Sequence, residues 1–111
     1  MFYIDSETNN IYITKGDTAT LGIDLYLDDE PYTMQEGDKL YFAVKAGSDF
    51  NYVLFSKEVE TNSIDFYSAD TFGLSAITAD YSITLIYANG NRDTFVTGKF
   101  NILGVCYGET E

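Results

Sequence analysis

The clearest pattern in the sequence is an alternation of apolar and polar side chains, which is most regular over residues 18–27. Successive side chains of a β-strand point to opposite faces, so a period of two predicts a strand with one buried face. The apolar positions here are Ala19, Leu21, Ile23, Leu25 and Leu27. We therefore predict one long strand over residues 18–27.

The same alternation recurs at residues 39–46, and again at residues 81–88 and 94–103. The last two segments flank Asn89-Gly90, the pair that most strongly favours a type I′ turn, because both central residues of that turn need positive φ. We expect these two segments to be antiparallel neighbours. Shorter β-rich segments follow the same logic at residues 10–14, 52–59 and 63–67, with Thr61-Asn62-Ser63 as the turn between the last two.

Residues 68–79 depart from the period of two. Asp70 is suited to cap a short helical turn that would carry Phe72, Leu74 and Ile77 toward the core. One helical turn does not change the fold class.

Seven to eight short strands separated by polar turns predict an all-β fold, an immunoglobulin-like antiparallel β-sandwich with at most one short helical turn. A chain of 111 residues suits one domain, and it buries roughly two-thirds of its unfolded surface. We expect a single domain over residues 1–111 with its core at roughly 11–105. Pro31, the single proline, is placed in the loop 28–31, where it interrupts no ladder.

A short motif occurs twice, as Lys15-Gly16-Asp17 and as Glu36-Gly37-Asp38, each time just before a long predicted strand. Glycine permits a tight bend, and the aspartate can bond the backbone just beyond it. We interpret both motifs as structural strand starts rather than ligand sites.

Charge narrows the classes of partner. Six Lys and Arg residues stand against 18 Asp and Glu residues, for a net charge of −12 with no histidine. Such a surface repels phosphate backbones and anionic membranes, so neither nucleic acid nor membrane is expected as a partner. Cations, basic protein surfaces and neutral sugars stay open, although acidity also serves plain solubility.

The residue inventory argues against catalysis. Without histidine, and with Cys106 as the single cysteine, the chain cannot build a Ser-His-Asp triad, a Cys-His pair, a typical zinc site or an internal disulfide. Two carboxylates suffice for a glycosidase, but no pair here stands in a distinctive motif. We therefore expect no enzyme, no catalytic residues and no cofactor, and Cys106 is taken as an inert apolar side chain.

The acidic run Asp28-Asp29-Glu30 raises the question of calcium, which takes several oxygen ligands. A site would need the run to fold back near Glu36 or Asp38, and the spacing of an EF-hand is absent from the sequence. A solvated turn is the favoured interpretation, and calcium binding there is left open.

Tyrosine is abundant, with ten residues. The alternation places Tyr26 and Tyr41 on the outer faces of their strands, where they either form cross-strand pairs or anchor a protein or sugar interface. The pattern does not choose between these roles, and it assigns no binding residues.

The amino-terminal segment Met1 to Asp5 has neither the basic segment nor the apolar run of a signal peptide, and no apolar stretch approaches membrane-spanning length. We expect synthesis in the cytoplasm and retention there, unless a larger assembly carries the chain elsewhere.

Two sets of segments resemble a known family. The first set comprises residues 13–19 (Ile-Thr-Lys-Gly-Asp-Thr-Ala), the alternating strand that follows them, and residues 32–45 (Tyr-Thr-Met-Gln-Glu-Gly-Asp-Lys-Leu-Tyr-Phe-Ala-Val-Lys). A second set comprises Asp70-Thr71, Leu74, residues 79–85, Asn89-Gly90, residues 93–95 and residues 98–102. Together they resemble the amino-terminal module of phage baseplate upper proteins, found in phage and prophage structural proteins of Gram-positive bacteria.

The resemblance spans roughly residues 11–105 and implies an immunoglobulin-like sandwich that packs in several copies into a baseplate or tail tip. It implies other tail or baseplate proteins as partners, self-association, and a location in the virion. Such relatives continue into a helical linker and a carboxy-terminal domain, so a chain that ends at Glu111 is expected to be an assembly module rather than an adaptor. The alternative function is a carbohydrate-binding or adhesin-like β-sandwich.

Overall fold

The structure, a computed structural model, describes residues 1–46, 52–74 and 76–104. Cys106 and the last residue of the predicted core range lie outside the described residues. The described part contains ten strands and one helix. Their bounds are β1 Phe2–Ile4, β2 Ile11–Thr14, β3 Ala19–Gly22, β4 Tyr26–Leu27, β5 Glu30–Pro31, β6 Lys39–Ala46, β7 Tyr52–Val59, β8 Ser63–Phe66, α1 Ser68–Phe72, β9 Thr78–Ile86 and β10 Arg92–Leu103.

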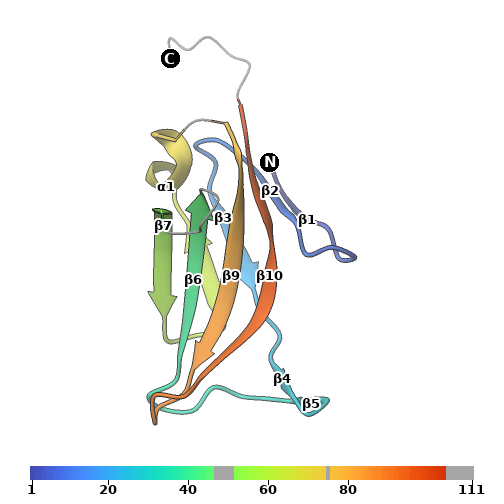
Figure 1. Cartoon of the computed structure of the whole chain (residues 1–111), viewed down its shortest axis with the longest axis vertical. Helices are drawn as coiled ribbons and strands as arrows, with labels where there is room; N and C mark the ends of the chain where they lie inside the picture. The colour runs from blue at the N-terminus through green and yellow to red at the C-terminus, as the bar shows by residue number, and fades with distance from the viewer. Residues whose placement is uncertain (47–51, 75, 105–111) are drawn as a thin grey trace.

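The strands form two layers. One is a six-stranded sheet in the order β1-β2-β10-β9-β6-β7, and the other is the pair β3–β8. Figure 1 shows β3 and β8 behind β6, β9 and β10, with the small β4–β5 hairpin extending from the lower end. The predicted all-β fold with almost no helix is confirmed, whereas the immunoglobulin-like topology stays a prediction.

The core lies between the two layers and is centred on aromatic rings. Phe42 of β6, Phe66 of β8 and Phe100 of β10 are almost completely buried. The ring centroid of Phe42 lies 5.3 Å from that of Phe66 and 5.9 Å from that of Phe100. Such pairs stabilise by about 0.5–1.5 kcal/mol each beyond their buried area. Aliphatic side chains surround the rings, namely Ile11, Ile13, Leu21, Leu40, Val44, Ile64, Ile83, Leu85 and Ile102.

Strands β6 and β7 match their predicted ranges, whereas β9 occupies residues 78–86 instead of 81–88 and β10 occupies residues 92–103 instead of 94–103. Strand β6 occupies residues 39–46 with Leu40, Phe42 and Val44 buried, and β7 occupies residues 52–59. The turn after β7 does not join a hairpin, however, because β7 pairs with β6 while β8 pairs with β3. The chain therefore crosses from one layer to the other between residues 59 and 63.

The predicted strand over residues 18–27 is wrong as a continuous element, although its burial pattern holds. Leu21, Ile23 and Leu25 are buried, but the strand ends at Gly22 and pairing resumes only in β4. The interruption arises because the chain leaves β8 and turns back on itself. The Tyr32 N–H then donates to the Leu25 carbonyl at 2.8 Å.

The turn between β4 and β5 accounts for the residues found at positions 27–31. Asp28 and Asp29 both have positive φ, 54° and 66°, as a two-residue type I′ turn requires, and Leu27 pairs with Glu30 across it. Pro31 is therefore in a strand, not the predicted loop. It pairs with Tyr26 at a position between hydrogen-bonded pairs, so its missing N–H breaks no ladder bond.

The β9–β10 hairpin is antiparallel as predicted, but its turn is not type I′. Only Gly90 has positive φ, 94°. Its N–H donates to the Tyr87 carbonyl at 2.8 Å, and the Tyr87 N–H donates to the Asn91 carbonyl at 2.8 Å. This is the three-residue loop in which a left-handed glycine follows a turn, because Asn89 keeps negative φ.

The helical turn forms at residues 68–72, and the Asp70 carboxylate accepts the Tyr67 N–H at 2.7 Å. Leu74 and Ile77 pack against the core as expected. Phe72 does not, since 61% of it is exposed. Thr71 is buried in its place because its hydroxyl accepts the Gly16 N–H at 2.8 Å, which fixes the opposite helix face inward.

The first and last strands of the core break the predicted antiparallel pattern. Strand β2 pairs with β10 in parallel, with Ile11 beside Phe100 and Ile13 beside Ile102. Strand β1, which lies before the predicted core, pairs with β2 on the other side. The parallel pairing is possible because β2 and β10 are not joined by a short turn but by most of the chain.

The repeated Gly-Asp motif is structural, as expected, but its aspartates act differently from the prediction. Gly16 and Gly37 have φ of 84° and 93°, each at the third position of a hydrogen-bonded turn. Asp38 bonds backward to the Gln35 N–H at 2.9 Å rather than to the backbone beyond it. Asp17 accepts the amino terminus instead.

Candidate functional site

The best candidate surface is the outer face of the six-stranded sheet, defined here as the face that points away from β3 and β8. Strand register aligns its side chains in rows across β6, β9 and β10. These rows are Lys45–Asp80–Lys99, Ala43–Ser82–Thr97, Tyr41–Thr84–Thr94 and Lys39–Ile86–Arg92. The face is therefore mostly hydroxyl and charged.

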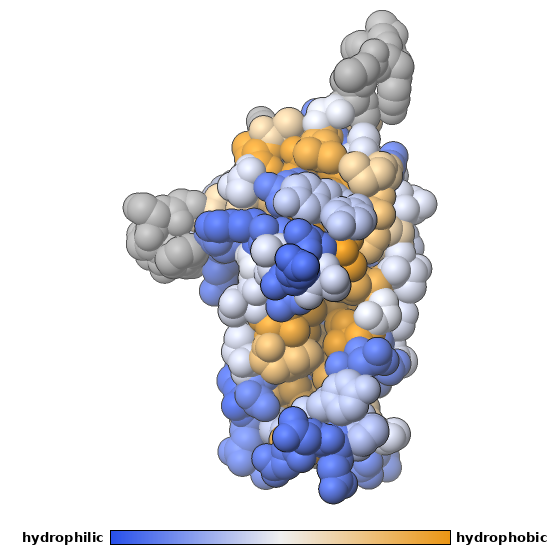
Figure 2. All heavy atoms as spheres, turned by 90° about the vertical axis from the view of Figure 1, so that its right-hand side faces the viewer, coloured by the Kyte–Doolittle hydropathy of each residue, from blue (hydrophilic) through white to orange (hydrophobic). Residues whose placement is uncertain are grey.

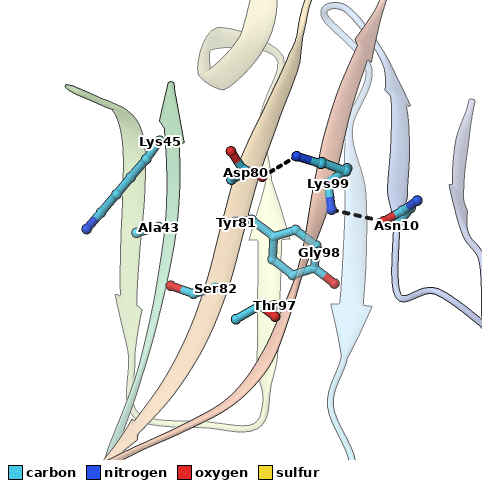
Figure 3. Close-up of a pocket in the computed structure, with 9 residues that line it drawn as sticks. All are labelled: Asn10, Ala43, Lys45, Asp80, Tyr81, Ser82, Thr97, Gly98 and Lys99. Carbon is cyan, nitrogen blue, oxygen red and sulfur yellow. Dashed lines mark hydrogen bonds and ion pairs between the residues drawn. The ribbon is translucent and has the colours of Figure 1, made fainter. Parts of the chain in front are cut away.

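An open groove of about 530 Å³ lies on this face. Figure 3 shows the carboxylate of Asp80 and the ammonium of Lys99 meeting between β9 and β10, with Lys45 on the neighbouring strand β6. Its volume falls within the range typical of small-ligand sites. The lining residues are Asn10, Ala43, Lys45, Asp80, Tyr81, Ser82, Thr97, Gly98 and Lys99.

The side of the groove near β2 depends on Gly98. A Cβ at this position would lie 2.7 Å from the Asn9 carbonyl oxygen and 3.0 Å from the Tyr81 ring. The absence of a side chain lets the segment before β2 approach β10. The Tyr81 hydroxyl then donates to the Asn9 carbonyl, and the Lys99 N–H donates to the Asn10 side-chain oxygen at 3.0 Å.

Tyr81 supports the groove from beneath rather than offering a ring to a ligand. Only 3% of the residue is exposed, and burial raises the pKa of its hydroxyl to about 12. Its role in the groove is therefore to hold the segment at residues 9–10 in place as a neutral hydrogen-bond donor.

Lysine side chains provide the charge of the groove. The Lys99 ammonium lies 2.8 Å from the Asp80 carboxylate, and both side chains are partly exposed, so the pair stabilises the fold by no more than about 1 kcal/mol. Lys45 takes part in none of the three ion pairs found among the described residues. The groove therefore offers positive charge to a partner.

Charge is unevenly distributed over the molecule. Four of the six basic residues, Lys39, Lys45, Arg92 and Lys99, occupy outer-face positions. The carboxylates at outer-face positions of β6, β7, β9 and β10 are Glu58 and Asp80. The outer face therefore carries more cations than carboxylates on a chain whose net charge is −12.

Asp80 is the one carboxylate among the described residues that line the groove, whereas glycoside hydrolysis uses two. Across residues 1–46, 52–74 and 76–104, no group of three or more His, Cys, Asp or Glu side chains is placed to hold a metal ion.

The acidic run considered for calcium lies elsewhere. Asp28, Asp29 and Glu30 are exposed at the tip of the β4–β5 hairpin. Of the two carboxylates that a calcium site would have recruited, Glu36 is exposed and Asp38 is buried. Both oxygens of Asp38 accept protein hydrogen bonds, from Tyr32, Gln35 and Ala88. The structure thus agrees with a solvated turn.

The tyrosines differ in exposure and in their contacts with other aromatic rings. Tyr26 is 66% exposed, and Tyr41 is half-buried on the outer face. Tyr3 and Tyr12 face each other across β1 and β2 with ring centroids 5.9 Å apart, which is a cross-strand pair. Tyr26 is free of any such pair among the described aromatic contacts and suits an interface.

Comparisons with known proteins gave no match among protein-family models, curated proteins or solved structures. Within the described residues, no helix has the length and apolarity needed to cross a membrane.

Proposed function

We propose that the protein is a non-enzymatic structural module of a phage or prophage tail or baseplate that acts through protein–protein contacts. The observation that carries the proposal is the outer face of the six-stranded sheet, a broad polar surface with a shallow groove and a local excess of cations. The matched runs over residues 11–105 provide the link to phage baseplate modules. The partners are other tail or baseplate proteins and further copies of the chain, and its location is the virion.

The arrangement of strands supports the immunoglobulin-like part of the proposal. In that architecture one sheet contains the third, sixth and seventh strands, and the second and fifth strands pair in the other sheet. Here β6, β9 and β10 are neighbours in the large sheet, and β3 pairs with β8. The distribution of strands between layers is therefore compatible with the expected topology.

Exposed aromatic side chains add contact area away from the groove. Tyr26 and Tyr52 are each 66% exposed, and Tyr67 is 58% exposed. Tyrosine is enriched at protein interfaces because it supplies a large area with few rotatable bonds. The net charge of −12 disfavours nucleic acid and anionic membranes as the binding partner of these surfaces.

A carbohydrate-binding module is the second candidate, favoured by the side chains of Asn10, Ser82 and Thr97 in the groove. These groups can exchange hydrogen bonds with sugar hydroxyls. The ring that lines the groove, Tyr81, is however 3% exposed and cannot stack on a sugar face. The protein-contact function is therefore the better supported of the two.

Purified particles from an induced prophage test the proposal. We expect the chain to be present in purified tails at a fixed ratio to other tail proteins and to capture one of them in a pull-down. A chain absent from the particles would contradict the proposal. Binding to a glycan array that is lost in Ser82→Ala with Thr97→Ala would favour the carbohydrate alternative, provided that it is kept in the exposed control pair Thr18→Ala with Thr33→Ala.

A further inference from the structure

We propose that the acidic tip of the β4–β5 hairpin of one copy docks into the outer-face groove of a second copy. The inference rests on the proposed function, because it names the surfaces through which an assembly module would associate with itself. It follows from three observations: the positive charge of the groove, the narrow shape of the hairpin, and the opposite charges of groove and hairpin tip.

The groove is the receiving surface. Lys45 and Lys99 lie at outer-face positions on either side of Asp80, in one register row. Because Lys99 already pairs with Asp80, one positive charge is left over in this row. The hydroxyls of Ser82 and Thr97 in the next row can donate to an incoming carboxylate.

The hairpin has the form of an inserting element. Figure 1 shows it extending from the lower end of the molecule, and Figure 2 shows hydrophilic side chains gathered at that end. Its type I′ turn holds Asp28 and Asp29 at the tip, followed directly by Glu30. Two strands of two residues each give it a narrow width.

Apolar side chains next to the tip would add hydrophobic burial to the electrostatic attraction of the contact. Tyr26 is 66% exposed and Leu27 is 42% exposed, and both precede the turn. A docked tip would bring these side chains against the aliphatic stems of the lysines on the groove side. Burial of this area adds affinity that ionic strength does not screen.

Charge decides which surfaces can meet. Two copies that each carry −12 repel each other in most orientations, so contact is favoured where a cationic surface meets an acidic one. Three consecutive carboxylates at the hairpin tip complement the excess cations of the outer face. Complementary charge of this kind fixes orientation and speeds association.

The proposed contact joins two different surfaces, so it is heterologous. After one contact, the copy that inserts its tip keeps an unused groove and the copy that receives it keeps an unused tip. Repetition of the contact therefore gives a closed ring or an open filament. The rotation between successive copies decides between the two, and a ring is the form that suits a tail component.

The test uses two double variants of the full chain. Asp28→Asn with Asp29→Asn removes two of the three carboxylates at the tip and keeps a residue that tolerates positive φ at each position. Lys45→Gln with Lys99→Gln removes the groove charge. By analytical ultracentrifugation we expect the wild type to self-associate, and each double variant to associate at least about tenfold more weakly. Glu7→Gln with Glu60→Gln, which removes two exposed charges elsewhere, is the control expected to match the wild type.

Mixing the two variants gives the decisive result. The groove variant keeps an intact tip and the tip variant keeps an intact groove, so an equimolar mixture is expected to form dimers that do not extend further. Circular dichroism first establishes that each variant is folded. A mixture as weakly associated as its components, or self-association unaffected by either double variant, would overturn the inference.

The outcomes separate this inference from the proposed function. A wild type that stays monomeric at millimolar concentration but is found in tail particles overturns the hairpin contact and leaves the structural function standing. Head-to-tail association of a chain that is absent from particles supports the contact and contradicts the phage assignment.

Discussion

The carboxylate of Asp38 accepts a hydrogen bond from the backbone N–H of Ala88, 3.0 Å away and 50 residues further along the chain. The same carboxylate accepts the Gln35 N–H at 2.9 Å and the Tyr32 hydroxyl. One buried side chain therefore joins the turn before β6 to the turn of the β9–β10 hairpin. It fixes the lower end of the sheet that carries the groove.

Replacement of Asp38 is expected to destabilise the fold strongly. Asp38→Ala leaves two backbone N–H groups and one hydroxyl without their acceptor, and an unmade buried hydrogen bond costs more than a formed one contributes. We expect Tm to fall by roughly 10 °C, measured by circular dichroism. Asp24→Asn, at an exposed aspartate, is the matched control expected to leave Tm nearly unchanged. Equal effects of the two changes would contradict the role assigned to Asp38.

Low pH should remove the contribution of Asp38 to the stability of the fold. The hydrogen bond from Tyr32, and then that from the Gln35 N–H, holds the pKa of Asp38 below its ordinary value. Its contribution is fully present above the unfolded pKa of about 3.9, and it is lost as pH falls from there through the lowered folded pKa. The difference in Tm between wild type and Asp38→Asn should therefore shrink as pH falls below about 4. A difference that stays constant down to pH 2 would argue against this linkage.

High pH should ionise Tyr32, whose hydroxyl donates to the Asp38 carboxylate, and thereby destabilise the fold. The hydrogen bond to Asp38, followed by desolvation, raises the pKa of Tyr32 to about 12. The neutral phenol is favoured in the fold, so its contribution is present below about pH 10 and is lost as pH rises toward 12. Tyrosine absorbance during a pH titration should show Tyr32 and Tyr81 ionising near pH 12. Tyr32→Phe should remove one of them, and Tyr81→Phe the other.

Two glycines offer a matched test of backbone strain against steric fit. Gly37 and Gly90 have nearly equal φ, 93° and 94°. A Cβ at position 37 would lie 2.8 Å from the Ala88 Cβ, whereas a Cβ at position 90 meets nothing within 4 Å. Gly90→Ala should cost about 1–2 kcal/mol from the left-handed conformation alone. Gly37→Ala should cost about 1–3 kcal/mol more, because overpacking is added. Chemical denaturation measures both, and equal costs would contradict the close approach to Ala88.

Replacing a buried phenylalanine should cost far more free energy of unfolding than replacing an exposed one. Phe42→Ala removes a ring with no exposed surface that contacts Phe66 and Phe100. It should cost about 3–5 kcal/mol. Phe72→Ala removes a ring that is 61% exposed and should change stability by no more than about 0.5 kcal/mol. Denaturant unfolding of both variants compares them, and a large loss from Phe72→Ala would show that the helical turn depends on this ring.

The alternation of apolar and polar residues predicted which side chains are buried better than it predicted which residues form strand hydrogen bonds. Leu21, Ile23 and Leu25 are buried as the period of two requires, yet hydrogen bonding to β8 stops at Gly22. The period reports which side chains share an environment, and an irregular backbone can keep that order without a strand partner. For β6 the predicted range and the structure coincide, whereas β9, which also has a strand partner on each side, begins three residues earlier than predicted and ends two residues earlier.

The groove could not be predicted because its parts are distant in sequence. Lys45 and Lys99 are brought onto one row by the pairing of β6 and β10 with Asp80 of β9. The charge total of −12 averages over the whole surface and conceals a face with excess cations. Similarly, the outward position of Phe72 is decided by a hydrogen bond from Gly16 to Thr71, 55 residues away, which no local pattern encodes.

The parallel pairing of β2 with β10 has a consequence for synthesis in the cell. Ile11 pairs with Phe100, a residue that is translated much later than Ile11. Contacts between residues so far apart in sequence form slowly, because the intervening loop must be ordered first. Until β10 has been synthesised, one edge of β2 therefore has unpaired backbone groups. The groove at residues 97–99 is complete only after that point, so a nascent chain cannot present this surface before β10 has joined the sheet.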